Sequence, residues 1–360
     1  MVKQINRVKH RTKKSLLIKA QKSLESILSD IPFIKIKDSK SNVRIDDNEI
    51  DIILNILVSG RPYEFIVEVK SQGEPRFVRM AIAQLKSYLQ DNKNSYGVLV
   101  APYLSDAARQ ICKESGLGCV DLVGNAFLSF KGIFIDRSGI PNPFSGSRRS
   151  KSVFSPKSSR ILRILLSNTS KRWFVEDISK EAGISIGLTS RIKQRLLAEE
   201  WIKEENKRFH LVKPDELFNQ WVSNYSYTKN QSFSYYSGLS DDQLEMAIKK
   251  ECDKRRWPYG LALFSGARKV APFVRFLKFF AYIGGDTKDI ANFLQLKKVD
   301  TGANVTLLSP YDDGVFYGLQ DINGINVVSD IQLYLDLKGY KGRGEEAAKA
   351  IFEQRIKPKW

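Results

Sequence analysis

Residues 49–73 read EIDIILNILVSGRPYEFIVEVKSQG and predict two apolar β-strands joined by a turn at Ser59–Gly60. Charged residues interrupt both runs, Asp51 near the start of the first and Glu68 and Lys70 at the end of the second. Because strand side chains alternate between faces, Glu68 and Lys70 point together to one face. Pairing about the turn brings Asp51 toward them. Isolated charges are costly inside a domain, so this convergence predicts a functional role.

Two carboxylates beside an ammonium suit metal-assisted hydrolysis of a phosphodiester bond. Carboxylate oxygens hold Mg²⁺ (or Mn²⁺), which keeps several waters. The metal polarises the phosphate and lowers the pKa of a bound water. We assign Asp51 and Glu68 as metal ligands, and Lys70 to orient the water or stabilise charge on the phosphate. The alternative is that Glu68 and Lys70 form an exposed ion pair at the end of an edge strand.

The pattern Asp–x16–Glu-x-Lys resembles the PD-(D/E)XK nuclease superfamily, which has the restriction-endonuclease-like fold. Glu25 on a preceding predicted helix adds to the resemblance, as do Gln84 and Tyr88 in QLKSY on a following one. No proline precedes Asp51, so only the acidic part of the first motif matches. The resemblance covers roughly residues 12–136 and implies a Mg²⁺-dependent DNA endonuclease. The catalytic residues that it implies are Asp51, Glu68, Lys70, Gln84 and Glu25. A domain of this fold that binds DNA without cutting it is a further alternative.

Residues 158–213 predict three helices and a β-hairpin, which together look like a winged helix-turn-helix. Leu188, Ile192 and Leu196 have the spacing of a core-facing stripe on the third helix. The other side chains of that helix, and the basic residues of the hairpin, are expected to be exposed and to contact DNA. These predicted DNA-binding residues are Ser185, Thr189, Ser190, Arg191, Lys193, Gln194, Lys203, Lys207 and Arg208. The alternative is a winged helix used for protein contacts.

The composition predicts a polyanionic partner. The chain has 58 Lys and Arg against 40 Asp and Glu, a net charge of +18. A basic, Ser- and Pro-rich linker is predicted at residues 138–157, where Arg148 and Arg149 are expected to contact DNA phosphates. Three cysteines without a C-x-x-C pair and two histidines argue against a zinc site and favour a reducing cytoplasm. No apolar run reaches membrane-spanning length, so no membrane partner is expected.

The C-terminal region is similar to the AbiEi-type antitoxins of type IV toxin–antitoxin systems, best in the stretch IQLYLDLKGYKGRGEEAAKAI. The likeness covers roughly residues 158–356. It implies a winged helix coupled to an α/β domain, in a protein that represses its own operon. A cognate toxin protein and a homodimer stay open as partners. Four aspartates of this region are expected at turns and helix caps rather than at a metal: Asp312, Asp313, Asp330 and Asp336.

The prediction is therefore an α/β protein with a mixed-sheet nuclease-like domain, a winged helix-turn-helix and a C-terminal α/β domain. The expected boundaries are 1–137 for the nuclease-like domain, 138–157 for the linker, 158–213 for the winged helix and 214–360 for the last domain. The predicted function is Mg²⁺-dependent DNA cleavage, targeted by the winged helix. The alternative function is a non-catalytic transcriptional regulator or antitoxin.

Overall fold

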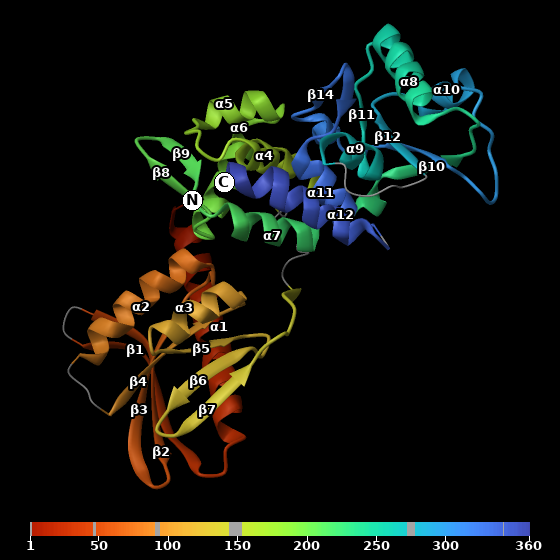
Figure 1. Ribbon diagram of the computed structural model, residues 1–360. Helices are drawn as coiled ribbons and strands as arrows, with labels where there is room; N and C mark the ends of the chain where they lie inside the picture. The colour runs from red at the N-terminus through yellow and green to blue at the C-terminus, as the bar shows by residue number, and fades with distance from the viewer. Residues whose placement is uncertain (1, 46–47, 91–93, 144–152, 272–277, 341) are drawn as a thin grey trace. The chain divides into compact units, whose positions relative to one another are not determined.

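The computed structural model describes all residues except 1, 46–47, 91–93, 144–152, 272–277 and 341 (Figure 1). The chain divides into two compact units, one containing Met1–Ser150 with Ala198–Glu200 and the other Lys151–Leu197 and Trp201–Trp360. Within the described part of the chain, no helix has both the length and the apolar character needed to span a membrane.

The first unit is a seven-stranded mixed sheet with helices on both faces. Its strands follow the order β1-β2-β3-β4-β5-β6-β7. The pairs β3–β4 and β4–β5 are parallel, and the other pairs are antiparallel. The elements are α1 (Val2–Ser29), β1 (Ile34–Ile45), β2 (Asn48–Val58), β3 (Arg61–Val69), α2 (Pro75–Leu89), β4 (Ser95–Ala101), α3 (Asp106–Glu114), β5 (Gly118–Asp121), β6 (Ala126–Phe130) and β7 (Ile133–Arg137).

The turn between β2 and β3 lies where the sequence predicts it. Ser59 and Gly60 have φ angles of 48° and 80°. Both values are left-handed, as a two-residue hairpin turn requires. Val58 pairs with Arg61 beside this turn, which fixes the register of the whole hairpin.

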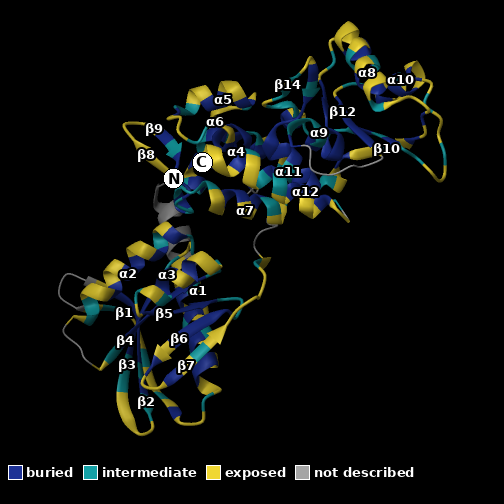
Figure 2. Cartoon of the chain, viewed as in Figure 1, coloured by how far each residue is buried: buried dark blue, intermediate teal, exposed yellow. Residues whose placement is uncertain are grey.

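Side-chain alternation gives the first unit two separate cores. Leu54 of β2 and Val67 of β3 pack in one cluster with Leu24 of α1. Ile53 and Ile66 pack in the other cluster, with side chains of α2 and α3. The interior strands β4 and β5 are therefore almost entirely buried (Figure 2).

The second unit begins with three helices and a two-stranded hairpin. These are α4 (Pro156–Ser167), α5 (Val175–Ala182), α6 (Ile186–Ala198), β8 (Ile202–Glu205) and β9 (Arg208–Leu211). Gly183 ends α5 in the left-handed conformation, with φ 62°. The Ile184 amide then donates to the Ser179 carbonyl, which closes the helix end and turns the chain into α6.

A six-stranded sheet with flanking helices completes the second unit, in the strand order β10-β13-β12-β11-β15-β14. Its elements are α7 (Pro214–Asn224), β10 (Gln231–Tyr235), α8 (Asp241–Arg255), β11 (Tyr259–Leu261), α9 (Leu263–Val270), β12 (Phe279–Ile283), α10 (Thr287–Phe293), β13 (Val305–Ser309), β14 (Gln320–Ile322), β15 (Ile325–Val327), α11 (Asp330–Lys338) and α12 (Gly344–Ile351). A single hydrophobic core runs through the unit, from Leu165 of α4 and Phe209 of β9 to Leu333 of α11.

Candidate active site

The two predicted metal ligands lie on neighbouring strands. Ile53 of β2 pairs with Ile66 of β3, so two residues further along this register Asp51 stands opposite Glu68. Both carboxylates share the face of Ile53 and Ile66, which α2 and α3 cover. Asp51 is 4% exposed and Glu68 5% exposed. The Val69 amide donates to Asp51 Oδ2 at 2.9 Å, which ties one acid to the strand that carries the other.

Lys70 connects the acid pair to α2. Its Nζ donates to Glu68 Oε1 at 2.6 Å and to Gln84 Oε1 at 2.6 Å. Tyr88 lies one helical turn beyond Gln84. Burial raises the pKa of Tyr88, and the negative charges of Glu68 and Asp51 raise it further. The structure therefore brings Asp51, Glu68, Lys70 and Gln84 into one cluster, with Tyr88 within its electrostatic field.

The alternative of an exposed ion pair at the end of an edge strand is wrong. β3 lies between β2 and β4 in the interior of the sheet. The Glu68 side chain is 6% exposed and the Lys70 side chain 25% exposed. A buried carboxylate in a central strand needs compensation by charge and hydrogen bonds, and Lys70 supplies both.

A second lysine, which the sequence analysis did not single out, also joins the cluster. Lys13 of α1 places its Nζ 3.1 Å from Asp51 Oδ1 and 3.7 Å from Glu49 Oε1. Burial lowers the pKa of Lys13, but the hydrogen bond and charge of Asp51 outweigh that effect and raise it. Glu49 and Glu68 raise it further through their charges. Basic residues are common in this part of the chain, and no sequence spacing distinguishes Lys13 from its neighbours.

Glu25 does not join the cluster, and this correction follows from the geometry of α1. Glu25 lies twelve residues after Lys13, about 18 Å along the helix axis. Its carboxylate accepts a hydrogen bond from Gln21 at 2.8 Å. The neighbouring Leu24 packs with Val67, on the sheet face opposite to Glu68. Glu25 is therefore separated by about 18 Å along α1 from Lys13, the residue of that helix that contacts Asp51.

The electrostatics of the acid pair fit a cation. Burial raises the pKa of Glu68, the hydrogen bond from Lys70 lowers it, and the charge of Asp51 raises it again. Among the residues that the structure describes, no group of three or more His, Cys, Asp and Glu is arranged to hold a metal. Two carboxylates with waters and substrate phosphates are nevertheless a usual Mg²⁺ environment. Asp51 and Glu68 are therefore a fitting donor pair.

The exposed face of α6 differs from the predicted one. Ser185, Arg191 and Gln194 are exposed and Ser190 is partly exposed, as the helix spacing predicts. Ile192 and Leu196 are buried in the core, and Leu188 packs against it. Four of the predicted DNA-binding residues of this helix thus remain accessible to a partner: Ser185, Ser190, Arg191 and Gln194.

The predicted exposure of Thr189 and Lys193 is wrong. Thr189 is fully buried, and its hydroxyl donates to the Ser185 carbonyl at 3.2 Å. Lys193 is 8% exposed, and its Nζ lies 2.5 Å from Glu204 Oε1 on β8 and 5.7 Å from the Phe209 ring centroid. The hairpin packs on this side of α6, so Lys193 connects helix and hairpin instead of facing outward.

The predicted basic residues of the hairpin are exposed. Lys203 lies on β8, Lys207 in the turn and Arg208 on β9, where its guanidinium lies 4.6 Å from the Phe174 ring centroid. Arg148 and Arg149 lie outside the described residues.

A buried polar network in the second unit was not predicted. Asp336 of α11 is fully buried and accepts hydrogen bonds from Tyr225 at 2.6 Å, Tyr282 at 3.0 Å and Gln332 at 2.8 Å. Burial raises the pKa of Asp336 to about 6 against the opposing effect of these hydrogen bonds. Asp336 therefore has neither the turn nor the cap role expected for it, whereas Asp312 does cap a short helix through Gly314.

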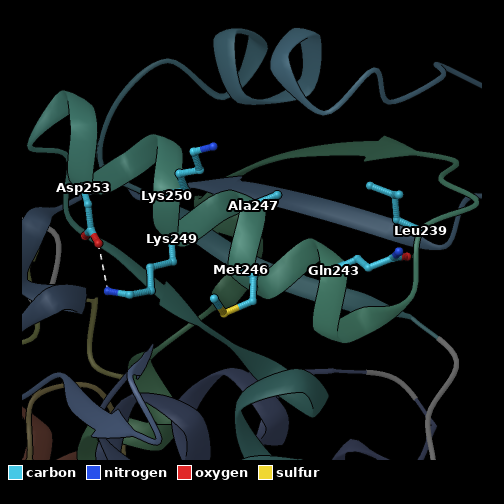
Figure 3. Close-up of a pocket in the computed structure, with 7 residues that line it drawn as sticks. All are labelled: Leu239, Gln243, Met246, Ala247, Lys249, Lys250 and Asp253. Carbon is cyan, nitrogen blue, oxygen red and sulfur yellow. Dashed lines mark hydrogen bonds and ion pairs between the residues drawn. The ribbon is translucent and has the colours of Figure 1, made fainter.

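A surface hollow of about 590 Å³ lies along α8 (Figure 3). Its lining residues are Leu239, Gln243, Met246, Ala247, Lys249, Lys250 and Asp253. The side chain of Lys249 pairs with Asp253 at 2.8 Å across one helical turn. None of the residues predicted from the sequence to bind metal or DNA lines this hollow.

Part of the second unit matches a protein-family model. Residues 210–357 match the family model described as transcriptional regulator, AbiEi antitoxin, type IV TA system. This match confirms the resemblance predicted for the C-terminal region. It begins within β9, so it leaves α4, α5 and α6 outside. A comparison with curated proteins found no match.

Comparison with solved structures found distant similarities. A repair endonuclease from Pyrococcus abyssi is 18% identical over 28% of this chain and 46% of that chain, with a TM-score of 0.22. A structure described as an EndoMS–dsDNA2 complex is 17% identical over 28% of this chain and 43% of that chain, with a TM-score of 0.21. This chain thus spans less than half the length of either. A protein of unknown function, AF1548, is 13% identical over 51% of this chain and 98% of that chain, with a TM-score of 0.22. Such scores assign no fold, so the nuclease-like fold stays a prediction.

Proposed function

We propose that this protein binds DNA as a transcriptional regulator of the AbiEi-antitoxin type and that its first unit hydrolyses DNA phosphodiester bonds with a divalent metal. The family match at residues 210–357 supports the regulatory part. The exposed Arg191 and Gln194 on α6, ahead of a hairpin with three exposed basic side chains, are suited to a DNA groove. The net charge of +18 favours a nucleic acid partner. A cognate toxin protein and a second copy of the chain are further proposed partners.

The regulatory proposal is tested with a reporter gene placed behind the DNA that lies upstream of the protein's own coding sequence. We expect the intact protein to repress the reporter and to bind that DNA in a mobility-shift assay. Equal reporter output with and without the protein, at levels where it is folded and abundant, would contradict autoregulation.

The catalytic proposal depends on one observation, the convergence of Asp51, Glu68, Lys70 and Gln84 on one face of the sheet. A regulator that only binds DNA has no physical need to bury two carboxylates side by side. Perturbed groups held by specific partners are typical of functional sites.

Each residue has a distinct proposed role. Asp51 and Glu68 would hold Mg²⁺ or Mn²⁺. When bound, the metal would polarise the scissile phosphate and provide an acidic water. Lys70, whose ammonium is partly accessible to solvent, would donate hydrogen bonds to a phosphate oxygen or to the attacking water. Gln84 is a positioning residue, because its amide oxygen holds Lys70 Nζ at 2.6 Å.

The catalytic proposal predicts that the purified protein cleaves duplex, single-stranded or branched DNA when a divalent metal is present. We expect Lys70→Ala to reduce cleavage by about 100-fold or more, because it removes a donor to developing charge, while DNA binding persists. Lys86→Ala is the control, because Lys86 is an exposed lysine of α2, the helix of Gln84, and lies outside the cluster. Unchanged cleavage by Lys70→Ala would refute the assignment. DNA binding without cleavage at any metal concentration would leave a non-catalytic regulator.

A further inference from the structure

In the acid pair, each carboxylate has one oxygen that accepts a hydrogen bond from a neighbouring residue of the first unit. Asp51 Oδ2 accepts from the Val69 amide at 2.9 Å, and Glu68 Oε1 accepts from Lys70 at 2.6 Å. The backbone amide of a central strand cannot move away without breaking the sheet. The remaining oxygen of Asp51, Oδ1, is therefore the one that can accept a cation, and it lies 3.1 Å from Lys13 Nζ.

Lys13 approaches this oxygen from a different direction than Lys70. It lies on α1, one turn before Leu17, which packs that helix against the sheet. Its side chain is 52% exposed, whereas that of Asp51 is 6% exposed. Lys13 is thus a solvated cation on a long stem at the open side of the cluster, also within 3.7 Å of Glu49. An ion pair with one well-exposed partner is worth little, so another cation can displace it.

An ammonium and a divalent cation on the same carboxylate oxygen repel each other strongly at contact distance, so each weakens the binding of the other. We propose that Lys13 competes with the divalent cation for Asp51 Oδ1 and thereby sets the metal affinity of the centre. This inference rests on the proposed metal-dependent function. When the metal binds, it must first displace that ammonium.

The test measures metal binding in the full-length protein without DNA. Mn²⁺ is titrated, and the free ion is followed by electron paramagnetic resonance. We expect Lys13→Met to bind Mn²⁺ about three- to sixfold more tightly than the wild type, because the competing ion pair is lost. Lys14→Met removes the same charge from the adjacent, exposed position and should leave the affinity within a factor of about 1.5. Lys13→Arg keeps a cation at the position and should not tighten binding.

The outcomes separate this inference from the function on which it rests. If Asp51→Asn weakens Mn²⁺ binding and Lys13→Met binds no more tightly than the wild type, the competition is refuted and the metal centre stands. If Asp51→Asn binds Mn²⁺ as the wild type does, both proposals fail. Should Lys13→Met not fold, Lys13→Gln replaces it, with tighter Mn²⁺ binding again expected and unchanged binding again decisive against competition.

Discussion

At Asp336 the fold removes a carboxylate from water and surrounds it with donors. Tyr225, Tyr282 and Gln332 all donate to it. Arg163 of α4 is also buried, and its positive charge favours the ionised form of Asp336. Burial outweighs these effects and raises the pKa of Asp336 to about 6. Because the cost of burying the charge exceeds the gain from its partners, this residue should destabilise the folded protein at neutral pH.

The pH dependence of the free energy of unfolding tests whether Asp336 destabilises the folded protein. In the unfolded chain Asp336 takes up its proton only near about pH 4, whereas in the folded protein it does so near pH 6. Its contribution to stability is therefore greatest below about pH 4 and is lost as the pH rises through 6. We expect the free energy of unfolding, wild type minus Asp336→Asn, to fall by about 3 kcal/mol between about pH 4 and pH 7 in urea titrations. A pH-independent difference would contradict this assignment.

The sequence predicts the spatial neighbours of some residues and not of others. Glu68 is the second-last residue of β3 and Lys70 directly follows the last one, so continued alternation places them together. Lys13 was not predicted, and the turn or cap role predicted for Asp336 was wrong, because the surroundings of both residues come from distant parts of the chain. Lys13 meets Asp51 only through the packing of α1, and Asp336 meets Tyr225 and Tyr282 only in the finished fold.

At the scale of the element, α6 presents a narrower exposed face than its spacing predicts, because β8 and β9 cover one side of it. Arg191 is exposed, whereas Lys193 is held by Glu204. We expect Arg191→Ala to weaken DNA binding and to lower the slope of log affinity against log salt by about 1, since one phosphate contact is lost. Fluorescence anisotropy at several salt concentrations measures this slope.

A substitution of Lys193, which is buried against the hairpin, is the control for Arg191→Ala. Lys193→Ala should leave the salt slope unchanged and lower the free energy of unfolding by about 1–3 kcal/mol, because it breaks a charged hydrogen bond. An unchanged slope in Arg191→Ala, or a reduced one in Lys193→Ala, would argue against docking through this face of α6.

Elements with strong periodicity were predicted, and β1 was not. The three helices α4 to α6 follow from apolar residues at helical spacing, and the β2–β3 hairpin from its turn and its apolar runs. Residues 34–45 read IKIKDSKSNVRI and are mostly polar. β1 forms the edge of the sheet, where one side of the strand is solvated and charged residues are tolerated. Its strand character comes from pairing with β2, which a local pattern does not reveal.

At the scale of the whole molecule, composition changes predict a basic linker and an α/β pattern for the regions on either side of it. They do not reveal which regions share a core. The second unit joins α4 to α6 and the C-terminal sheet in one hydrophobic cluster, and polar contacts reinforce it. Arg160 of α4 pairs with Asp312 at 2.8 Å, far along the chain. Trp360 donates to the Leu166 carbonyl at 3.1 Å. The helices proposed to bind DNA and the region matched to the antitoxin family are thus built on common packing.

This shared core predicts that the two parts of the second unit unfold together. Leu165→Ala in α4 deletes side-chain volume from the common cluster and should cost about 2–5 kcal/mol. Hydrogen exchange followed by mass spectrometry should then show faster exchange in β12 as well as in β9. Val327→Ala in β15 is the reciprocal variant and should speed exchange in β9. If either substitution speeded exchange only on its own side of the core, α4 to α6 and the β8–β9 hairpin would fold separately from the C-terminal sheet. Packing alone could then not couple these two parts of the second unit.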